Sequence, residues 1–371
     1  MKRVLILPFL NIPSGHQQVA DSLISHLEIT GEQFLCKKVD IFSYSYGFIE
    51  KYVTNLYLKW IRHLPKTYSY LYRRMVIETL SEDKEKFFYE NFFFRQMLKI
   101  LREFSPDFIL CTHALPSRLL NRLKRDAGLK IPVFNIYTDF FIHNGWGFSH
   151  IDGHFVASGR MKNILLSKGI DPGKIFITGI PIHPLFRKKP LVAEPPRRKP
   201  SILISGGSMG SGNMEGIIRL LANQKNSPFH FYVLCGKNQG LFRKLSKLKS
   251  DHISPLPYIS SRKVMDLIYN QADLIITKPG GVTISECLKK RLPIMIYDKL
   301  PGQEEINYEE LRLMNLAMEM GKWGKASDLL EQMSDFFSSP SKLSSYLSSV
   351  YQYEKMLDSE SPTEIIIRGF L

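Results

Sequence analysis

Short apolar runs alternate with amphipathic stretches along most of the chain. Residues 3–10 and 34–41 are apolar runs of strand length, and residues 17–27 between them carry apolar side chains at helical spacing. Further apolar runs occupy residues 106–113, 131–139, 155–157, 175–179, 201–205, 231–236, 256–259, 272–276 and 293–297. This alternation of strands and helices is typical of a doubly wound sheet, so the pattern predicts an α/β protein.

The strand–loop–helix units form two series, separated by a basic segment rich in proline. A chain of 371 residues is too long for one ordinary core and suits two domains. We expect an N-terminal Rossmann-like domain over residues 1–186, a linker over 187–200 and a second Rossmann-like domain over 201–340. Residues 341–371 are predicted to be helical and to pack back on the first domain.

Composition and charge narrow the classes of protein. A hydrophobic content of 44% with 23% charged residues is typical of a soluble globular protein. The formal net charge of +15 implies an acidic partner, either nucleic acid or an anionic membrane surface. The four cysteines are scattered without a C-x-x-C spacing, which suggests neither a zinc site nor a disulfide framework and fits the reducing cytoplasm.

Targeting and membrane-spanning signals are weak. No apolar stretch reaches about 18 residues, so we expect no transmembrane helix. The start of the chain has basic residues but only a short apolar run, which predicts a first strand and not a signal peptide. Aromatic and basic side chains crowd residues 51–74, a mixture that suits the interface of an anionic bilayer or single-stranded nucleic acid. Of these two partners the membrane is favoured.

The segment from Thr277 to Glu286 predicts a phosphate-binding turn. It follows an apolar run at 272–276 and leads into a helix, with Pro-Gly-Gly at the junction. Such a helix start presents backbone N–H groups to an anion, and the hydroxyls of Thr283 and Ser285 are possible further donors. Glu286, expected in the first helical turn, is suited to accept hydrogen bonds from sugar hydroxyls. A plain N-capped turn is the alternative, and the ten-residue context favours nucleotide binding.

Three further loops follow predicted strands and are candidates for chemistry. The glycine-rich loop at 206–212 could also cradle a phosphate. His16 begins the first helix, where it is either a polar residue at a helix start or a base at the mouth of a cleft. Asp139 stands at the carboxyl end of the strand at 131–139, the edge at which doubly wound sheets bind ligands.

Taken together, these blocks resemble the diacylglycerol glycosyltransferases. That family includes bacterial processive diacylglycerol glucosyltransferases and plant monogalactosyldiacylglycerol synthases. The blocks occur in the family's order across most of residues 1–310. They are Ser14-Gly15-His16 with Gln18-Val19-Ala20, Thr138-Asp139 with His143 and Trp146, Gly179-Ile180-Pro181-Ile182, Gly206-Gly207-Ser208-Met209-Gly210, residues 277–286, and Pro301-Gly302-Gln303-Glu304.

The resemblance implies a GT-B fold, in which two Rossmann-like domains face a cleft and the second binds a UDP-sugar. The donor site would comprise residues for the diphosphate, the ribose (Glu286), the uracil (the backbone at Ile259) and the sugar (Gln303 and Glu304). The residues implied near the diphosphate are Gly207, Ser208, Met209, Lys278, Gly280, Gly281, Val282 and Thr283. In the first domain His16 and Asp139 match positions that act on the acceptor hydroxyl. Gly15, His143 and Trp146 would lie on the acceptor side.

The chemistry implied by the family agrees with these residue types. An inverting transfer needs a base for the acceptor proton and a cradle for the leaving diphosphate. Backbone amides and a helix N-terminus can supply the cradle, so neither a metal nor a cofactor is expected, and the UDP-sugar is a substrate. His16 titrates near neutrality in its ordinary state, whereas Asp139 could orient it or act as the base itself. The sequence leaves this choice open.

The resemblance implies UDP-glucose or UDP-galactose as donor and a membrane lipid such as diacylglycerol as acceptor. It places the enzyme in the cytoplasm, peripheral on the inner face of the cell membrane, with no nucleic acid as partner. The first loop lacks the second histidine of the plant Ser-Gly-His-Gly-His pattern, since Gln17 and Gln18 stand there, which leaves the acceptor and processivity open. Transfer to a soluble acceptor is one alternative. Nucleic-acid binding, suggested by the charge and by residues 51–74, is the non-enzyme alternative.

Overall fold

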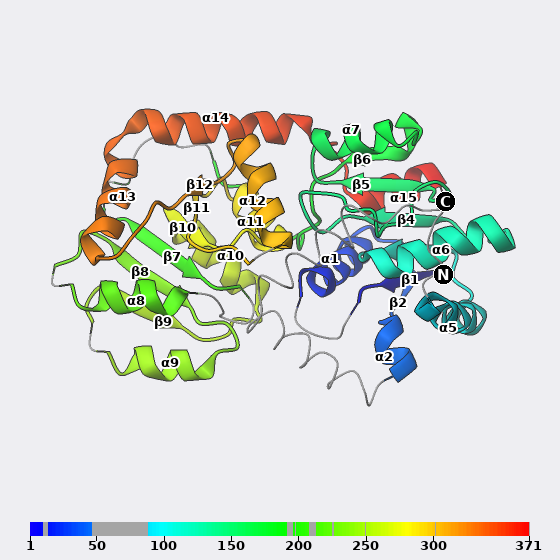
Figure 1. The fold of residues 1–371 in the computed structure, drawn as a ribbon, viewed down its shortest axis with the longest axis horizontal. Helices are drawn as coiled ribbons and strands as arrows, with labels where there is room; N and C mark the ends of the chain where they lie inside the picture. The colour runs from blue at the N-terminus through cyan, green and yellow to red at the C-terminus, as the bar shows by residue number, and fades with distance from the viewer. Residues whose placement is uncertain are drawn as a thin grey trace. The chain divides into compact units, whose positions relative to one another are not determined.

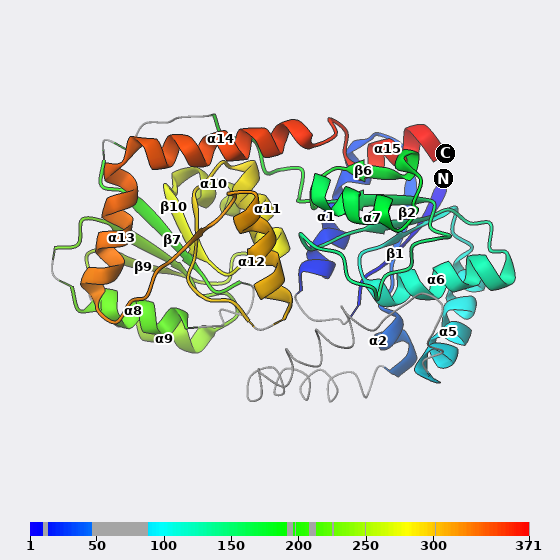
Figure 2. The same ribbon diagram turned by 45° about the horizontal axis from the view of Figure 1, so that its top comes forward.

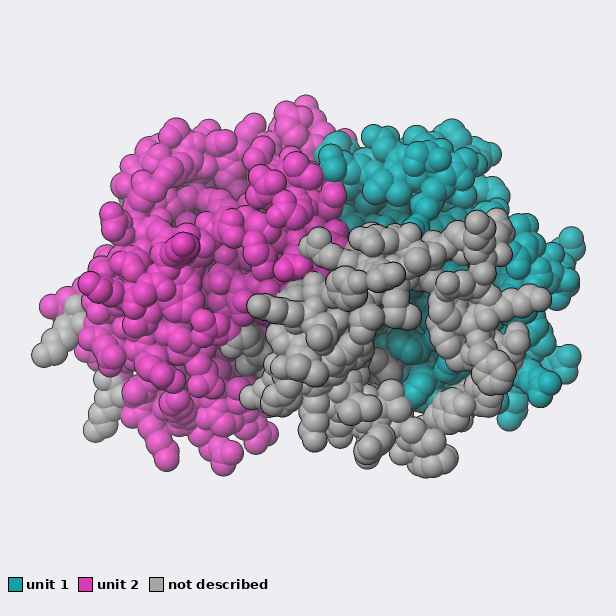
Figure 3. Space-filling view, viewed as in Figure 1, with its two compact units in different colours: residues 1–184, 356–371 teal, residues 185–355 magenta. Residues whose placement is uncertain are grey.

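The computed structural model forms two compact units. Unit 1 contains residues 1–184 and 356–371, and unit 2 contains residues 185–355 (Figure 3). Residues described by the structure are 1–9, 14–46, 88–190, 196, 198–207, 213–224, 226–248, 250–300 and 302–370. The aromatic and basic stretch at 51–74 therefore lies outside the described residues. Among the helices that the structure describes, none has the length and apolar character required to cross a membrane.

Unit 1 is built on a six-stranded parallel sheet with the order β2-β1-β3-β4-β5-β6 (Figure 1). Its strands are β1 (Lys2–Leu7), β2 (Phe34–Lys38), β3 (Phe108–Cys111), β4 (Val133–Ile136), β5 (Gly153–Val156) and β6 (Ile175–Ile177). The strand order reverses between β1 and β3. In doubly wound sheets ligands bind at such a switch point, beyond the carboxyl ends of the strands.

The described helices of unit 1 cover this sheet and complete its core. They are α1 (Gly15–Ile29), α2 (Ile41–Tyr46), α5 (Phe88–Phe104), α6 (Ala114–Ala127), α7 (Gly159–Ser167) and α15 (Pro362–Phe370). The C-terminal segment belongs here: the Asp358 carboxylate accepts from the backbone N–H of Ile177 at 2.8 Å, and the Asp358 N–H donates to the Ile177 carbonyl at 2.7 Å. The Phe370 ring packs edge-on against Phe134 at 4.9 Å.

Unit 2 has a second parallel six-stranded sheet, with the order β12-β11-β10-β7-β8-β9. Its strands are β7 (Ser201–Ser205), β8 (His230–Leu234), β9 (Ile253–Leu256), β10 (Leu274–Thr277), β11 (Ile294–Ile296) and β12 (Met318–Glu319). The order reverses between β7 and β10, which is the arrangement of a Rossmann-type sheet. The loops after β7 and β10 are therefore the expected ligand-binding loops of this unit.

Helices lie on both faces of the second sheet (Figures 1 and 2). They are α8 (Met214–Ala222), α9 (Gln239–Ser246), α10 (Arg262–Gln271), α11 (Gly281–Lys289), α12 (Gln303–Leu313), α13 (Ala326–Ser338) and α14 (Pro340–Met356). The predicted fold class is thus confirmed, with two doubly wound α/β units. The short strand β12 was not predicted, because its two residues lie in no apolar run.

The boundaries of the units differ in detail from those expected. The chain enters unit 2 at residue 185, so the predicted linker at 187–200 lies within that unit. The predicted C-terminal segment is divided: residues 341–355 of α14 belong to unit 2, and only residues 356–371 belong to unit 1. An amphipathic pattern predicts that a helix buries one face, but it does not specify against which domain.

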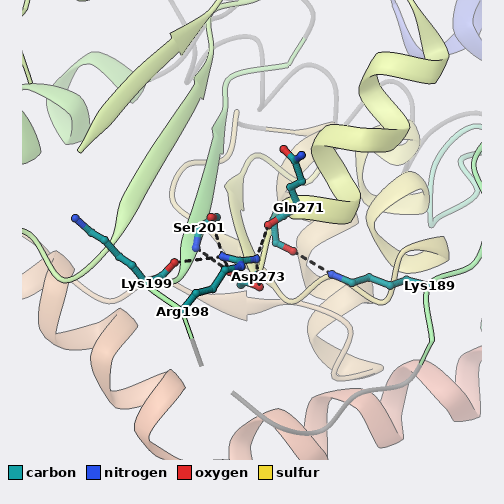
Figure 4. A network of polar contacts seen from close by, with 7 residues as sticks. Lys189, Arg198, Lys199, Ser201, Gln271 and Asp273 are labelled. Atoms are coloured by element: carbon teal, nitrogen blue, oxygen red, sulfur yellow. Dashed lines mark hydrogen bonds and ion pairs between the residues drawn. The ribbon is translucent and has the colours of Figure 1, made fainter. Parts of the chain in front are cut away.

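The end of the expected linker is fixed by a network at the start of β7 (Figure 4). The Arg198 guanidinium donates to both carboxylate oxygens of Asp273, at 2.8 and 3.1 Å, and to the carbonyl of Gln271 at 2.9 Å. Asp273 also accepts from the backbone N–H of Ser201 at 2.8 Å, while Lys189 donates to the Ala272 carbonyl at 3.3 Å. This paired arginine therefore holds the entry of β7 against the entry of β10.

Candidate functional site

The turn between β10 and α11 forms an uncapped helix N-terminus at the switch point of unit 2. Thr277 ends the strand and is 1% exposed, and α11 begins at Gly281 with Gly280 as its N-cap. Within the described chain no side chain caps this end. Since the first N–H groups of a helix have no partner inside it, Gly281, Val282 and Thr283 present donors to an anion. The predicted contribution of Ser285 is wrong, because its hydroxyl donates to the Gly281 carbonyl at 2.8 Å.

Glu286 is a buried carboxylate on α11. It lies in the second turn of the helix and not in the first, because α11 begins at Gly281. It is 6% exposed, and the Tyr269 hydroxyl of α10 donates to its Oε2 at 2.8 Å. Arg262 lies 4.0 Å from Oε1. Burial raises the pKa of Glu286 from 4.5 to about 7, against the opposing effects of the Tyr269 hydrogen bond and the Arg262 charge.

Lys278 and Glu304 are brought together where β10 and β11 end. The Lys278 ammonium donates to Glu304 Oε1 at 3.1 Å and is 6% exposed. Glu304 Oε2 accepts from the backbone N–H of Leu300 at 2.6 Å. Gln303, which directly precedes Glu304, begins α12 and is half-buried. The preceding Gly302 has φ +93°, a conformation that favours glycine, and its N–H donates to Glu305 at 3.0 Å.

The loop after β7 is described only in part. Gly207 has φ +73° and donates its N–H to the Ser205 hydroxyl at 3.2 Å. Ser208 and Met209 lie outside the described residues. Ile259 is half-buried between β9 and α10. The structure thus brings the β10–α11 turn, Glu286 and the Lys278–Glu304 pair to the carboxyl edge of one sheet, next to the start of the β7 loop.

In unit 1, the His16 side chain contacts polar groups from the loops after β3 and β4. It is the second residue of α1, and its Nδ1 lies 2.8 Å from the Thr112 carbonyl oxygen and 2.8 Å from the Thr138 hydroxyl oxygen. Thr112 follows β3 and in turn donates its hydroxyl to the His16 carbonyl at 3.1 Å. A carbonyl oxygen only accepts, so we assign the imidazole proton to Nδ1. In the neutral ring Nε2 then carries the lone pair that a general base requires.

The surroundings of His16 favour this neutral form. Burial lowers its pKa, while the negative charge of Asp139 and the Thr112 carbonyl partly offset that effect. Asp139 is half-buried and directly follows Thr138. The two residues predicted to be catalytic are therefore electrostatically coupled across 123 positions of sequence.

The loop after β4 is anchored by buried side chains. The Trp146 ring packs 4.6 Å from Tyr137 and is 4% exposed, so it lies in the interior of unit 1. Asn135 donates to the Gly147 carbonyl at 2.8 Å, and a side chain at Gly147 would meet Asn121 at 2.4 Å. Trp146 therefore helps to hold this loop in place. Its role on the acceptor side stays a prediction.

Three histidines meet near the switch point of unit 1. His143 accepts from the Gly145 N–H at 3.1 Å, and burial lowers its pKa to about 4. His113, which no sequence motif singled out, directly follows the Thr112 that holds His16. Its ring lies edge-on to His16 at 4.8 Å. The signal that could have identified His113 is its place just after β3, because β3 borders the switch point. Gly15 is exposed at the start of α1.

Two protein-family models match the chain, one in each half. The model of monogalactosyldiacylglycerol (MGDG) synthase matches residues 16–182. The model of the glycosyltransferase family 28 C-terminal domain matches residues 201–344. The first match contains His16 and Asp139, and the second contains the β10–α11 turn.

Named relatives are similar over most of their length. A Bacillus subtilis (strain 168) protein named uncharacterized glycosyltransferase YkoN is 45% identical over 361 residues, which cover 95% of this chain and 93% of the relative. The processive diacylglycerol beta-glucosyltransferase of Bacillus cereus (strain B4264) is 30% identical over 314 residues, covering 82% and 78%. Both similarities extend over more of the chain than either unit contains, so each includes parts of both units.

A solved structure supports the fold. The crystal structure of CalG4, the calicheamicin glycosyltransferase, matches with a TM-score of 0.63 at 12% identity, and the match covers 99% of this chain and 97% of that one. An identity this low defines the architecture alone. Together with the two doubly wound parallel sheets it identifies the fold as GT-B, as the sequence predicted.

Proposed function

The chain belongs to the glycosyltransferase family of the monogalactosyldiacylglycerol synthases and processive diacylglycerol glucosyltransferases, and we propose that it transfers a hexose from a UDP-sugar to a lipid alcohol such as diacylglycerol, with inversion at the anomeric carbon. Family membership makes it a sugar transferase. The nucleotide, the stereochemistry and the lipid are the parts that we propose.

The observation that carries the donor assignment is the N-terminus of α11 at the switch point of unit 2, which no described side chain caps. Its first-turn N–H groups and positive end suit the diphosphate of a nucleotide sugar. Glu286, one turn further on, offers carboxylate oxygens to ribose hydroxyls, and it is already partly desolvated. The Lys278–Glu304 pair contributes a fixed ammonium and carboxylate at the same sheet edge. UDP-glucose and UDP-galactose are the donors that we expect.

The proposed reaction is a single displacement. Nε2 of His16 accepts the proton of the acceptor hydroxyl as its oxygen forms a bond to the anomeric carbon. The bond from that carbon to the diphosphate oxygen breaks, and UDP leaves with the electron pair. The amides of α11 stabilise the charge on UDP, and Asp139 stabilises the imidazolium that forms at His16. Asp139 as the base is the alternative that the His16 variant below tests.

The proposed cradle is made of backbone amides, so we expect turnover without a bound metal or another cofactor. Dialysis against a chelator should leave the transfer rate unchanged. A loss that is restored by a divalent cation would contradict this part of the proposal.

A lipid acceptor requires access to a membrane surface. With a net charge of +15, the protein is expected to bind anionic lipid from the cytoplasmic side as a peripheral protein. Sedimentation with anionic vesicles should weaken as salt is raised, because exposed charges are screened over about 10 Å at 0.1 M salt. Equal binding to neutral and anionic vesicles would contradict the electrostatic attraction.

The proposed function is tested with vesicles that contain diacylglycerol and with labelled UDP-glucose and UDP-galactose. The wild-type protein should form a glycolipid with one of these donors, and Glu286→Ala should bind UDP at least about tenfold more weakly, since a hydrogen bond to a charged group contributes about 1.5–3 kcal/mol. Glu331→Gln, which removes an exposed glutamate from α13, is the matched control.

The other candidate functions give different results in the same experiment. Transfer to a water-soluble alcohol without transfer to diacylglycerol would replace the lipid acceptor by a soluble one. Absence of UDP binding by calorimetry would refute both enzyme functions. Salt-dependent affinity for RNA or DNA without UDP binding would instead support a nucleic-acid-binding protein.

A further inference from the structure

His113 and His16 present opposite hydrogen-bonding groups beside each other. His113 is the N-cap of α6, and its Nδ1 accepts from the backbone N–H of Leu115 at 3.2 Å. In the neutral ring its proton is therefore on Nε2, which is a donor. His16 has the reverse arrangement, because its Nδ1 donates to the Thr112 carbonyl and its Nε2 accepts. Two backbone hydrogen bonds thus fix the two tautomers.

The two rings are close enough to bind one small group of atoms. Their centroids are 4.8 Å apart and their planes are nearly perpendicular, at 87°. The Phe9 ring stacks against the His113 ring with centroids 4.5 Å apart, which restrains the plane of the imidazole. Both histidines are half-buried, and neither is fully enclosed by the described residues. Within the part of the chain that the structure describes, Nδ1 is the atom of His113 that is hydrogen-bonded.

Both rings remain neutral near pH 7, which preserves the donor and the acceptor. Burial and the neighbouring His16 and His143 rings hold the pKa of His113 well below its ordinary value. Burial also lowers the pKa of His16. A neutral pair suits an uncharged alcohol better than an anion, because neither ring brings a full positive charge.

We propose that His113 is an acceptor-binding residue, whose Nε2–H donates to a second oxygen of the substrate beside the hydroxyl that His16 deprotonates. This inference rests on the proposed function and defines the acceptor further. The substrate must carry a hydrogen-bond acceptor on a carbon next to the reacting alcohol. The ester oxygen next to the free hydroxyl of a 1,2-diacylglycerol meets this requirement, whereas a branched alcohol with two long alkyl chains and no second oxygen does not.

The test compares these two acceptors in vesicles of the same lipid. One is 1,2-dipalmitoylglycerol, and the other is 2-tetradecylhexadecanol, which has two chains and one hydroxyl but no second oxygen. The variant His113→Ser removes the Nε2 donor and keeps a hydroxyl that can cap α6. It should lower kcat/KM with the diacylglycerol about tenfold, the effect of one lost hydrogen bond, and lower it much less with the branched alcohol.

Two further variants separate binding from a purely structural role. His113→Gln carries an amide N–H near the place of Nε2 and should restore part of the preference for the diacylglycerol. His113→Phe should lose the preference like the serine variant and should also lower Tm, because the cap of α6 is lost. UDP affinity, which depends on unit 2, should be unchanged in all three variants.

The outcomes distinguish this inference from the proposed function. If the wild-type protein transfers sugar and His113→Ser affects the two acceptors equally, or neither of them, the role of His113 is overturned while the function stands. If the wild-type protein binds no UDP and forms no glycolipid, both are overturned. A selective loss with the diacylglycerol, partly restored by glutamine, supports the inference.

Discussion

Replacing Glu286 by glutamine should stabilise the protein at alkaline pH and weaken its donor site. The folded state raises the pKa of this buried carboxyl from 4.5 to about 7, so it binds the proton more tightly than the unfolded chain does. Its effect on stability is therefore most favourable below pH 4.5. The free energy of unfolding then falls as pH rises to about 7, and it changes little above that. At about 1.4 kcal/mol per pKa unit the full loss is about 3 kcal/mol.

Glutamine removes this cost and keeps an oxygen that accepts from the Tyr269 hydroxyl. Between pH 5 and pH 8 the stability of Glu286→Gln relative to the wild type should therefore increase by about 2–3 kcal/mol. Urea unfolding followed by circular dichroism at the two pH values measures this difference. Glu331→Gln removes an exposed charge from α13 and should show a difference near zero.

The same variant should lose donor affinity, because a neutral amide accepts hydrogen bonds from ribose less strongly than a carboxylate does. We expect UDP binding at pH 8 to weaken about tenfold or more. A difference in stability that stays constant from pH 5 to pH 8 would refute the reasoning on burial. A variant that is stabilised but binds UDP normally would refute the role of Glu286 in the donor site.

Three further predictions concern the base, a strained turn and an ion pair. His16→Ala should lower kcat by about 10²–10⁴ with unchanged UDP affinity by calorimetry, and full turnover would exclude His16 as the base and favour Asp139. Gly302→Ala should lower the free energy of unfolding by about 1–3 kcal/mol, because a side chain is strained at the φ of +93° found there. An unchanged midpoint of urea unfolding would contradict this. Glu354→Gln should lower the free energy of unfolding in urea by about 2 kcal/mol, since Glu354 is 12% exposed and pairs with Arg291 at 2.7 Å. An unchanged free energy of unfolding would mean that the ion pair does not stabilise the protein.

Much of the fold was predictable because it follows from local periodicity. The apolar run at 201–205 corresponds to β7 at the same bounds, and the helical spacing at 17–27 lies within α1. The glycines of the β10–α11 turn likewise predicted a helix start open to an anion. The strand β12 was missed, because two residues carry no periodic signal and are recruited by the neighbouring β11.

The proposed donor site follows from the sequence as a set of residues, whereas its electrostatics do not. The motif contains Glu286, yet Tyr269 and Arg262, which set its hydrogen bonding and charge, come from α10. Likewise Glu304 was predicted to contact the sugar, whereas the structure pairs it with Lys278. Such contacts depend on which helices pack together, and a pattern along one helix does not encode its partner.

The sequence by itself determined the two series of strand–loop–helix units, the glycine turns that follow their strands and, through its ordered motifs, the family. Each of these depends on residues that are close in the chain, where backbone geometry and periodicity act directly. Only the tertiary structure decided that β3 pairs with β1, across the intervening β2 and α5. That pairing brings Thr112 and His113 to His16, 96 and 97 positions earlier, and so fixes the tautomer of the proposed base. Backbone hydrogen bonds can join any two apolar segments as neighbouring strands. The order of the strands in the sheet therefore depends on the packing of the whole unit.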